Sequence, residues 1–588
     1  MRKLLGLVVL GSLIASPASA AQSLSVVYPP ANHQTTAKQI FFIGTAPPAG
    51  EVLVNGKQIL RSPAGHFAPS FPLKLGDNIF TLRYQNQQIQ IKVKRLSTAP
   101  EIPSGLAFAK DSLTPAVDIA RLPGELICFG AIAPPKANVT VRLANQTIPL
   151  MPQAQVQLAA NSASLTGQYQ PSFQSAAGQY QGCATVSSPS DLGLPKFQLT
   201  LNGKTTTQTG SGKISVISLA LLEVAEVTVD SGVARTGPST DYSRLTPLPK
   251  GTQATVTGRD GEWLRLDYGG WINSKETRIL KGAVPPRSLI RSIRARQVDG
   301  ATEIVFPLQV PVPVSVQQGE RTLTLTLYNT TAQTDIIRLD DNPLISRLDW
   351  QQVAPGQAQY TFNLKSQQQW GYKLRYDGTN LVLTLRHSPE NRNQQKEQNS
   401  LSLKGIKILL DPGHGGAEQG SKGPTGYPEK NINLVISKLV RKQLEQQGAI
   451  VYMTREDDRD VSLPERVAMI DKLEPVIALS LHYNALPDNG DAVNTKGLAA
   501  FWYHPQAHSL AVFLHKYLVN KLNRPDYGVY WNNLALTRPA TAPSVLLELG
   551  FMINPTEFEW IVNEEEQKKL ASAIVSGITQ WFSNPKQN

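Results

Sequence analysis

The sequence predicts a multidomain protein in which N-terminal all-β modules, sandwiches and a small barrel, precede an α/β domain with a mostly parallel sheet covered by helices on both faces. The chain has 588 residues, several times the usual ~100–200 of one domain. Short strand-like runs separated by turn residues fill the first two thirds, and 43 Gly and 42 Pro exclude a helical rod. From about residue 405 onward, apolar strand-like runs alternate with helical spacing, as in parallel sheets.

The first 20 residues have the pattern of a cleaved export signal. A cationic start at Met1–Lys3 is followed by the apolar run Leu4–Ala15 and by small residues up to Ala20. This run is shorter than the ~20 residues of a spanning helix, and no later stretch is long and apolar enough. We therefore expect an exported protein without a membrane span, in which two cysteines could pair.

Residues 22–97 predict a small β-sandwich, in which Asn55-Gly56 indicates a two-residue hairpin. Residues 120–220 repeat this character and resemble an immunoglobulin-like β module. Cys128 and Cys183 lie 55 apart there, each in a strand-like run, and such sandwiches often bridge their two sheets at this spacing. The Gln-, Ala- and Ser-rich stretch 156–175 between these strands is expected to be a loose insert.

Two further modules follow before a linker. Residues 227–280 resemble the bacterial Src-homology-3-like domain in the runs Val233-Ala-Arg-Thr-Gly-Pro and Gly261-Glu-Trp-Leu-Arg-Leu. Residues 285–388 alternate like strands and weakly resemble an AMIN-type wall-targeting domain. Residues 389–402 have no apolar period and predict a linker.

Four polar residues of the last domain, 403–583, fall where its strands end or its first helix begins. His414 follows the first strand in a Gly-rich turn, Glu429 opens the first helix, and His482 and Glu548 each end a strand. Ligands collect at this edge of a parallel sheet. Two imidazoles and one carboxylate, from His414, Glu429 and His482, make a three-ligand zinc site with a position left for water. Glu548 supplies a general base, and Asn484 could orient a ligand.

Each residue also has a simpler interpretation. A histidine near a turn is often a hydrogen-bonded surface residue, and Glu429 could complement the dipole of its helix. Glu548 is harder to explain in this way, because a carboxylate in a buried strand is costly unless it is paired or functional.

Six motifs, in order along residues 405–583, resemble the zinc-dependent N-acetylmuramoyl-L-alanine amidases of bacterial cell walls. They are Asp411-Pro-Gly-His-Gly-Gly, Gly423-Pro-Thr-Gly-Tyr-Pro-Glu-Lys-Asn-Ile-Asn-Leu, Thr454-Arg, Ser462-Leu-Pro-Glu-Arg, Ser480-Leu-His-Tyr-Asn-Ala and Pro543-Ser-Val-Leu-Leu-Glu-Leu-Gly-Phe-Met-Ile-Asn. The resemblance implies that His414, Glu429 and His482 bind Zn²⁺ and that Glu548 is the catalytic carboxylate. The departures from the family pattern, Glu418-Gln419 and Ile553-Asn554, are expected to touch no ligand.

The resemblance implies an exported peptidoglycan hydrolase, in the periplasm or cell wall, that cleaves the amide between N-acetylmuramic acid and the L-alanine of the stem peptide. The alternatives are a zinc peptidase acting on the stem peptide and a non-catalytic wall-binding scaffold. Residues 403–588 carry 19 Lys and Arg against 20 Asp and Glu, a net charge of −1, so residues 1–402 carry +13 and account for the positive charge of the whole chain, +12. We expect these basic modules to bind an anionic cell-wall polymer beside the peptidoglycan, and no nucleic acid.

Overall fold

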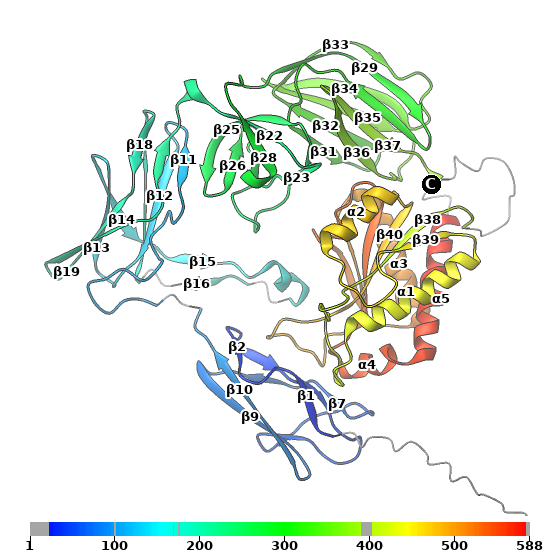
Figure 1. Cartoon of the computed structure of the whole chain (residues 1–588). Helices are drawn as coiled ribbons and strands as arrows, with labels where there is room; N and C mark the ends of the chain where they lie inside the picture. Colours follow the sequence, from blue (N-terminus) through cyan, green and yellow to red (C-terminus); the bar gives the residue numbers. More distant parts are fainter. Residues whose placement is uncertain (1–22, 99–100, 168–169, 175–176, 390–402, 584–588) are drawn as a thin grey trace, which may run out of the picture.

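The computed structural model describes residues 23–98, 101–167, 170–174, 177–389 and 403–583. The expected signal (1–20) lies outside these ranges, as does the expected linker (389–402) apart from Pro389. Figure 1 shows β modules arranged in an arc that leads from the first module back to the α/β domain. The multidomain architecture with a largely β N-terminal region is thus as predicted. In the described ranges no helix is long and apolar enough to cross a membrane.

The first module packs two main sheets, of orders β1-β4-β7 and β2-β10-β9-β5-β6, around an apolar core. The predicted hairpin is present, because Val54 pairs with Lys57 and both Asn55 and Gly56 have positive φ. The strands are β1 (Ser25–Tyr28), β2 (His33–Thr35), β3 (Gln39–Phe41), β4 (Ile43–Thr45), β5 (Leu53–Val54), β6 (Lys57–Gln58), β7 (His66–Phe67), β8 (Ser70–Pro72), β9 (Gly76–Tyr84) and β10 (Gln87–Arg95).

The second module is built on a six-stranded sheet of order β12-β17-β14-β13-β19-β20. Cys128 and Cys183 form a disulfide, as predicted, but they face each other on adjacent antiparallel strands of this one sheet. The expectation of a bridge between two sheets was therefore wrong. The strands are β11 (Ile119–Arg121), β12 (Leu126–Ile132), β13 (Asn138–Leu143), β14 (Gln146–Pro152), β15 (Gln155–Gln157), β16 (Ser172–Gln174), β17 (Gln179–Thr185), β18 (Ser190–Gly193), β19 (Lys196–Leu201), β20 (Lys204–Thr209) and β21 (Ile214–Val216).

The stretch 156–175 was expected to be a loose insert, and its described residues belong to an arm. Strands β15 and β16 pair antiparallel, and a 3₁₀ turn, η1 (Asn161–Leu165), follows β15. The arm reaches from the second module to the α/β domain (Figure 1).

The third and second modules share a sheet, because β11 pairs with both β21 and β25. The third module contains η2 (Leu219–Leu221), β22 (Val224–Val227), β23 (Ser231–Gly232), β24 (Leu248–Pro249), β25 (Gln253–Asp260), β26 (Trp263–Leu266), β27 (Trp271–Asn273), η3 (Ser274–Glu276) and β28 (Thr277–Leu280). The fourth packs sheets β33-β29-β30-β37-β36 and β31-β32-β35-β34 around one core. Its strands are β29 (Ser288–Val298), β30 (Ala301–Phe306), β31 (Val314–Gln318), β32 (Thr322–Tyr328), β33 (Thr330–Arg338), β34 (Ile345–Ala354), β35 (Gln357–Leu364), β36 (Tyr372–Asp377) and β37 (Asn380–Arg386).

The α/β domain has a six-stranded sheet of order β39-β38-β40-β43-β41-β42, in which the β41–β43 pair alone is antiparallel. The edge strand β42 was not predicted. The elements are β38 (Lys407–Pro412), α1 (Glu429–Gln446), β39 (Ile450–Met453), α2 (Leu463–Leu473), β40 (Ile477–Asn484), β41 (Leu498–Trp502), α3 (Pro505–Leu522), β42 (Asp526–Trp531), β43 (Ser544–Phe551), α4 (Pro555–Ile561) and α5 (Glu564–Ser583).

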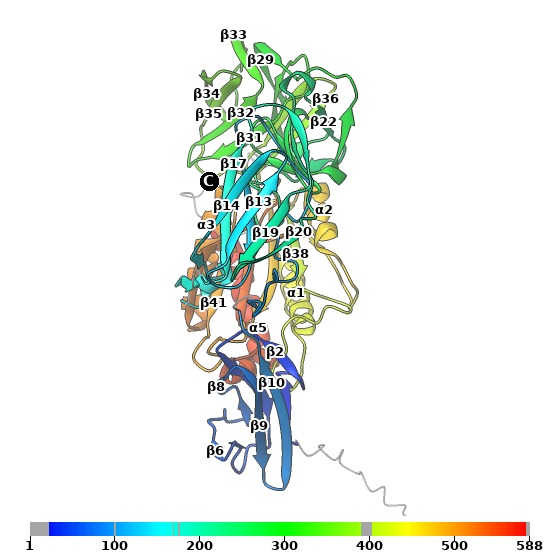
Figure 2. The same cartoon turned by 90° about the vertical axis from the view of Figure 1, so that its left-hand side faces the viewer.

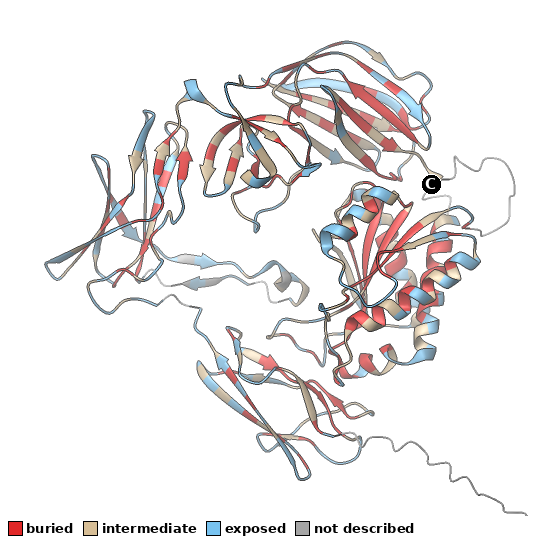
Figure 3. Cartoon of the chain, viewed as in Figure 1, coloured by how far each residue is buried: buried red, intermediate tan, exposed pale blue. Residues whose placement is uncertain are grey.

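Alternate residues of each strand separate the two faces of this sheet. Ile408, Leu479 and Leu547 face the core that also contains residues of α1, α3 and α5. Leu409 and Ala478 face the opposite side, where they pack with residues of α2. Because both faces are covered, the central strands are buried along most of their length (Figure 3). We call the side that carries α2 the cleft face.

The α/β domain contacts two other modules extensively. Trp370, from the segment before β36, is 3% exposed, belongs to the core under α1, α3 and α5, and stacks on Phe582 with 6.2 Å between ring centroids. At the other end, Phe41 and Ile43 of the first module share an apolar cluster with Phe551. The α/β domain is therefore packed against the fourth module at one end and against the first module at the other.

Candidate metal centre and catalytic carboxylate

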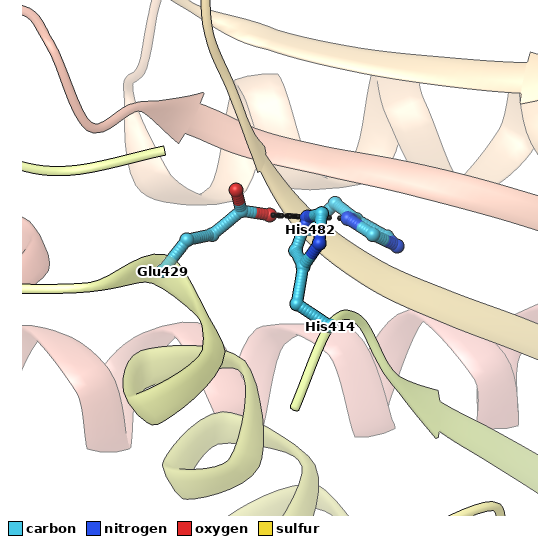
Figure 4. Close-up of side chains that lie close together, drawn as sticks. All are labelled: His414, Glu429 and His482. Carbon is cyan, nitrogen blue, oxygen red and sulfur yellow. Dashed lines mark hydrogen bonds and ion pairs between the residues drawn. The ribbon is translucent and has the colours of Figure 1, made fainter. Parts of the chain in front are cut away.

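His414, Glu429 and His482 converge from three different elements (Figure 4). Each offers one ligand atom, and these atoms lie within 4.8 Å of one another. His414 follows β38, Glu429 is the first residue of α1, and His482 lies near the end of β40. Two imidazole nitrogens and one carboxylate oxygen form a donor set that could hold a metal ion.

Glu429 is the centre of the group. Its Oε1 lies 3.0 Å from Nδ1 of His482 and 3.2 Å from Nε2 of His414. It also accepts the backbone N–H of Tyr483 at 3.0 Å, while Oε2 accepts the N–H of Ser421 at 2.9 Å. Burial raises the pKa of this carboxyl, but the two histidines outweigh burial and bring the pKa well below its usual range. Glu429 is therefore ionised although it is buried, and its carboxylate is available to a metal ion.

His414 itself has a left-handed backbone conformation, with a φ of 59°. Burial lowers its pKa, but Glu429 and Glu418 together raise the pKa above the ordinary value. Glu418 Oε1 lies 3.0 Å from Nδ1 of His414, so the expectation that Glu418-Gln419 touches no ligand was wrong. A carboxylate on the second ring nitrogen is a common means of fixing the orientation of a ligating histidine.

A buried ion pair holds the loop that carries His414. Asp411 and Arg466 are 1% and 3% exposed at their side chains, with 2.6 Å between Oδ1 and Nη1. Nη2 of Arg466 also donates to the carbonyl of His414 at 2.7 Å. Arg455 donates from Nη2 to the carbonyl of Gly413 at 2.9 Å. The sequence analysis gave these residues no role, although a charged residue such as Asp411 at the end of an apolar run was the available signal.

Gly413 lets the ligands approach one another. A Cβ atom at this position would lie 2.2 Å from Cε1 of His482. This distance is shorter than two non-bonded carbon atoms can approach, so no other residue fits here without a shift of His482. The loop therefore requires glycine for a close approach rather than for a turn.

Asn433 supports Glu429, whereas the orienting role expected of Asn484 stays a prediction. The Asn484 side chain accepts the N–H of Ala485, and a register shift separates it from His482. Asn433, one turn into α1, donates to Glu429 Oε1 at 3.1 Å and to the Gly413 carbonyl at 3.2 Å.

Glu548 lies beside the ligand group on the adjacent strand. It is the register partner of His482, and both alternate onto the cleft face. Its Oε2 atom is buried and has no hydrogen-bond partner among the described residues. Burial, and then the charge of Glu429, raise the pKa of Glu548 well above its usual value. A carboxyl in this environment keeps its proton to a higher pH than an exposed carboxyl does, which suits a group that takes up and returns a proton.

Comparison with known proteins identifies two segments of the chain. Residues 408–580 match the family model described as N-acetylmuramoyl-L-alanine amidase, and residues 231–277 match that of the bacterial SH3 domain.

The similar proteins include cell wall amidases. The probable cell wall amidase LytH of Staphylococcus epidermidis (strain ATCC 12228) is 36% identical over 200 residues, which are 34% of this chain and 66% of that protein. The Staphylococcus aureus protein of the same name is 37% identical over 190 residues, 32% of this chain and 62% of that protein. The match thus spans just under two thirds of these relatives.

Among solved structures, the N-acetylmuramoyl-L-alanine amidase of Clostridium difficile 630 is 28% identical, with a TM-score of 0.30, and the match covers 31% of this chain and 99% of that one. Residues 408–580 of this chain are thus similar to N-acetylmuramoyl-L-alanine amidases, and residues 231–277, ahead of that segment, are similar to bacterial SH3 domains.

Proposed function

We propose that the protein is an exported, zinc-dependent N-acetylmuramoyl-L-alanine amidase that removes stem peptides from peptidoglycan. The observation that carries this proposal is the convergence of His414, Glu429 and His482 beside Glu548, inside a domain of the amidase family. The domain assignment 22–97, 120–220, 227–280, 285–388 and 403–583 is part of the same proposal.

The donor set fits zinc. Two neutral imidazoles and a carboxylate suit this ion, and the alternative hard cations prefer oxygen ligands. Glu418 behind His414 and Asn433 behind Glu429 support the ligands, as expected around a metal. A zinc ion there would polarise the scissile carbonyl and lower the pKa of a water molecule toward ~7.

Glu548 handles the proton in this proposal. As a carboxylate it accepts a proton from the attacking water, and as a carboxylic acid it delivers that proton to the nitrogen of the leaving L-alanine. Its raised pKa suits the second step, because Glu548 then keeps the proton until the amide C–N bond breaks and the leaving nitrogen accepts it. The Asp411–Arg466 pair keeps the His414 loop in place throughout.

Digestion of purified peptidoglycan, followed by mass spectrometry of the products, tests the proposal. An amidase leaves sugar chains without peptides and releases peptides that begin with L-alanine. A zinc peptidase would leave shortened stems attached to the sugar, and a wall-binding scaffold would release nothing. Either of these results would refute the amidase assignment.

Export and wall binding are further parts of the proposal. The N-terminal pattern of residues 1–20 and the disulfide between Cys128 and Cys183 support an oxidising compartment such as the periplasm or cell wall. The net positive charge of the N-terminal modules supports binding of an anionic wall polymer, and release of the bound protein by salt would test it.

A further inference from the structure

The arm of the second module ends on the amidase domain. We define the arm as the described residues of 155–174, with η1 as its tip. Figure 1 shows the arm extending from the second module toward the α/β domain, and Figure 2 shows the second module in front of that domain when the molecule is viewed from the other direction. The Tyr527 hydroxyl donates a hydrogen bond to the Leu165 carbonyl. The Leu165 side chain packs on the apolar cluster of Ala499, Phe501 and Leu546.

This contact lies on the cleft face, next to Glu548. Leu546 precedes Glu548 by two residues on β43 and points to the same face, while Ala499 on β41 is the register partner of Glu548. Helix α2 covers the half of this face formed by β38 and β40. The other half is covered by residues of β42, by Leu534 and by the arm tip.

The described residues of the arm bury little apolar surface. Its two strands form a separate two-stranded sheet, and its apolar side chains Val156, Leu158 and Phe173 are 52%, 76% and 82% exposed. A lone two-stranded ladder is marginally stable in water, and regions with few buried contacts open at low cost. Its base is firmer, because β17 carries Cys183 of the disulfide. The tip can therefore leave the cleft face while its base stays in place.

We propose that the arm is a displaceable strap that competes with polymeric peptidoglycan for the half of the cleft face around Leu546 and Ala499. The inference rests on the proposed amidase function and concerns selectivity at the same site. A polymer that brings an amide to Glu548 must also cover the residues beside it, where Leu165 lies. A small muramoyl peptide needs less of this surface, so the arm selects against the polymer until it is displaced.

Leu165→Ser tests the strap through its kinetics. When a ligand binds only those molecules whose arm is displaced, its apparent affinity is reduced in proportion to their fraction. Loss of the Leu165 contact should shift the equilibrium between the docked and the displaced arm by about 5- to 30-fold, which corresponds to one or two kcal/mol. We expect KM for solubilised polymeric peptidoglycan to fall by about 5- to 30-fold with kcat within about twofold of the parent. KM for a soluble muramoyl peptide should stay within about twofold.

Leu158→Ser is the matched control, because it makes the same change on an exposed position of the same arm. Tyr527→Phe removes the hydroxyl from the arm contact and keeps the ring, so it should lower KM for the polymer in the same direction. An unchanged or higher KM for the polymer in Leu165→Ser would overturn the proposal. The arm would then either have no effect on binding of the polymer or contribute to it.

Hydrogen exchange provides a test that does not depend on turnover. In the full-length Glu548→Gln protein, amides of residues 161–167 should exchange faster when solubilised polymeric peptidoglycan is added. Unchanged or slower exchange would overturn the strap. A parent protein that releases peptide from neither substrate would refute the amidase function instead, and the exchange experiment would still decide the role of the arm.

Discussion

The substitution Glu548→Gln separates proton transfer from metal binding. Gln has nearly the shape of Glu, so the flanking leucines on β43 should pack as before, and the buried Oε2 gives up no hydrogen bond that the described structure contains. The three ligand residues are unchanged. The variant loses the base that accepts the proton and the acid that returns it, so turnover should fall by about 10²–10⁴-fold, or about 3–5 kcal/mol in the barrier.

The same variant has a pH-dependent effect on stability. Burial and the charge of Glu429 raise the pKa of Glu548 in the folded protein, whereas the unfolded chain releases this proton above about pH 4.3. The folded state therefore binds the extra proton, and the stability of the parent falls as pH rises from about 4.3 through the folded pKa. Gln does not titrate. Metal-free Glu548→Gln should match the parent near pH 4 and be more stable than the parent near pH 7.

Zinc content and peptide release measured on one preparation, with denaturant unfolding of the chelated protein at both pH values, check these expectations. Retained zinc with turnover within about threefold of the parent would remove Glu548 from the mechanism. Loss of zinc together with activity would instead make Glu548 a ligand. A stability difference that is the same at both pH values would contradict the buried, proton-holding carboxyl.

Three other predictions concern the metal, the loop support and the disulfide. Chelation should abolish peptide release, and added zinc should restore it. His482→Ala should lose metal and activity together, because one of three proposed ligands is gone. Undiminished turnover of the metal-free protein would exclude zinc. Arg466→Met should lower the free energy of unfolding by about 3–5 kcal/mol, because Asp411 is left buried and unpaired, and denaturant titration showing under about 1 kcal/mol would contradict this. Cys128 and Cys183 should resist alkylation without reductant, and free thiols would contradict the bond. Replacing both with Ser should lower the free energy of unfolding by on the order of 4 kcal/mol, given their separation of 55 residues.

Elements with a strong apolar period were predictable from the sequence. Helix α2 spans Leu463–Leu473 as expected, because Ser462 and Glu465 form a capping box at its start. The ligand group was predictable because each member stands at a strand or helix end. Strand β42 was missed because it is a short edge strand containing Gly528, formed by pairing with β41 rather than by its own pattern.

Contacts between distant segments were not predictable. Glu418 is an exposed acid in a glycine-rich loop, and its contact with His414 depends on the fold of that loop. The arm has no apolar period that would mark it as structured, and its target lies more than 300 residues away in the sequence. Local patterns contain no information on such pairings.

The position of Trp370 limits how the α/β domain can be separated from the rest of the chain. A fragment that begins after the linker at residue 402 would lack the indole and expose the hydrophobic residues of α5 that it covers, including Trp581. The boundary in the sequence is thus not the boundary of the hydrophobic core. Transfer of the α/β domain to another protein must therefore include Trp370 or supply a different large side chain in its place.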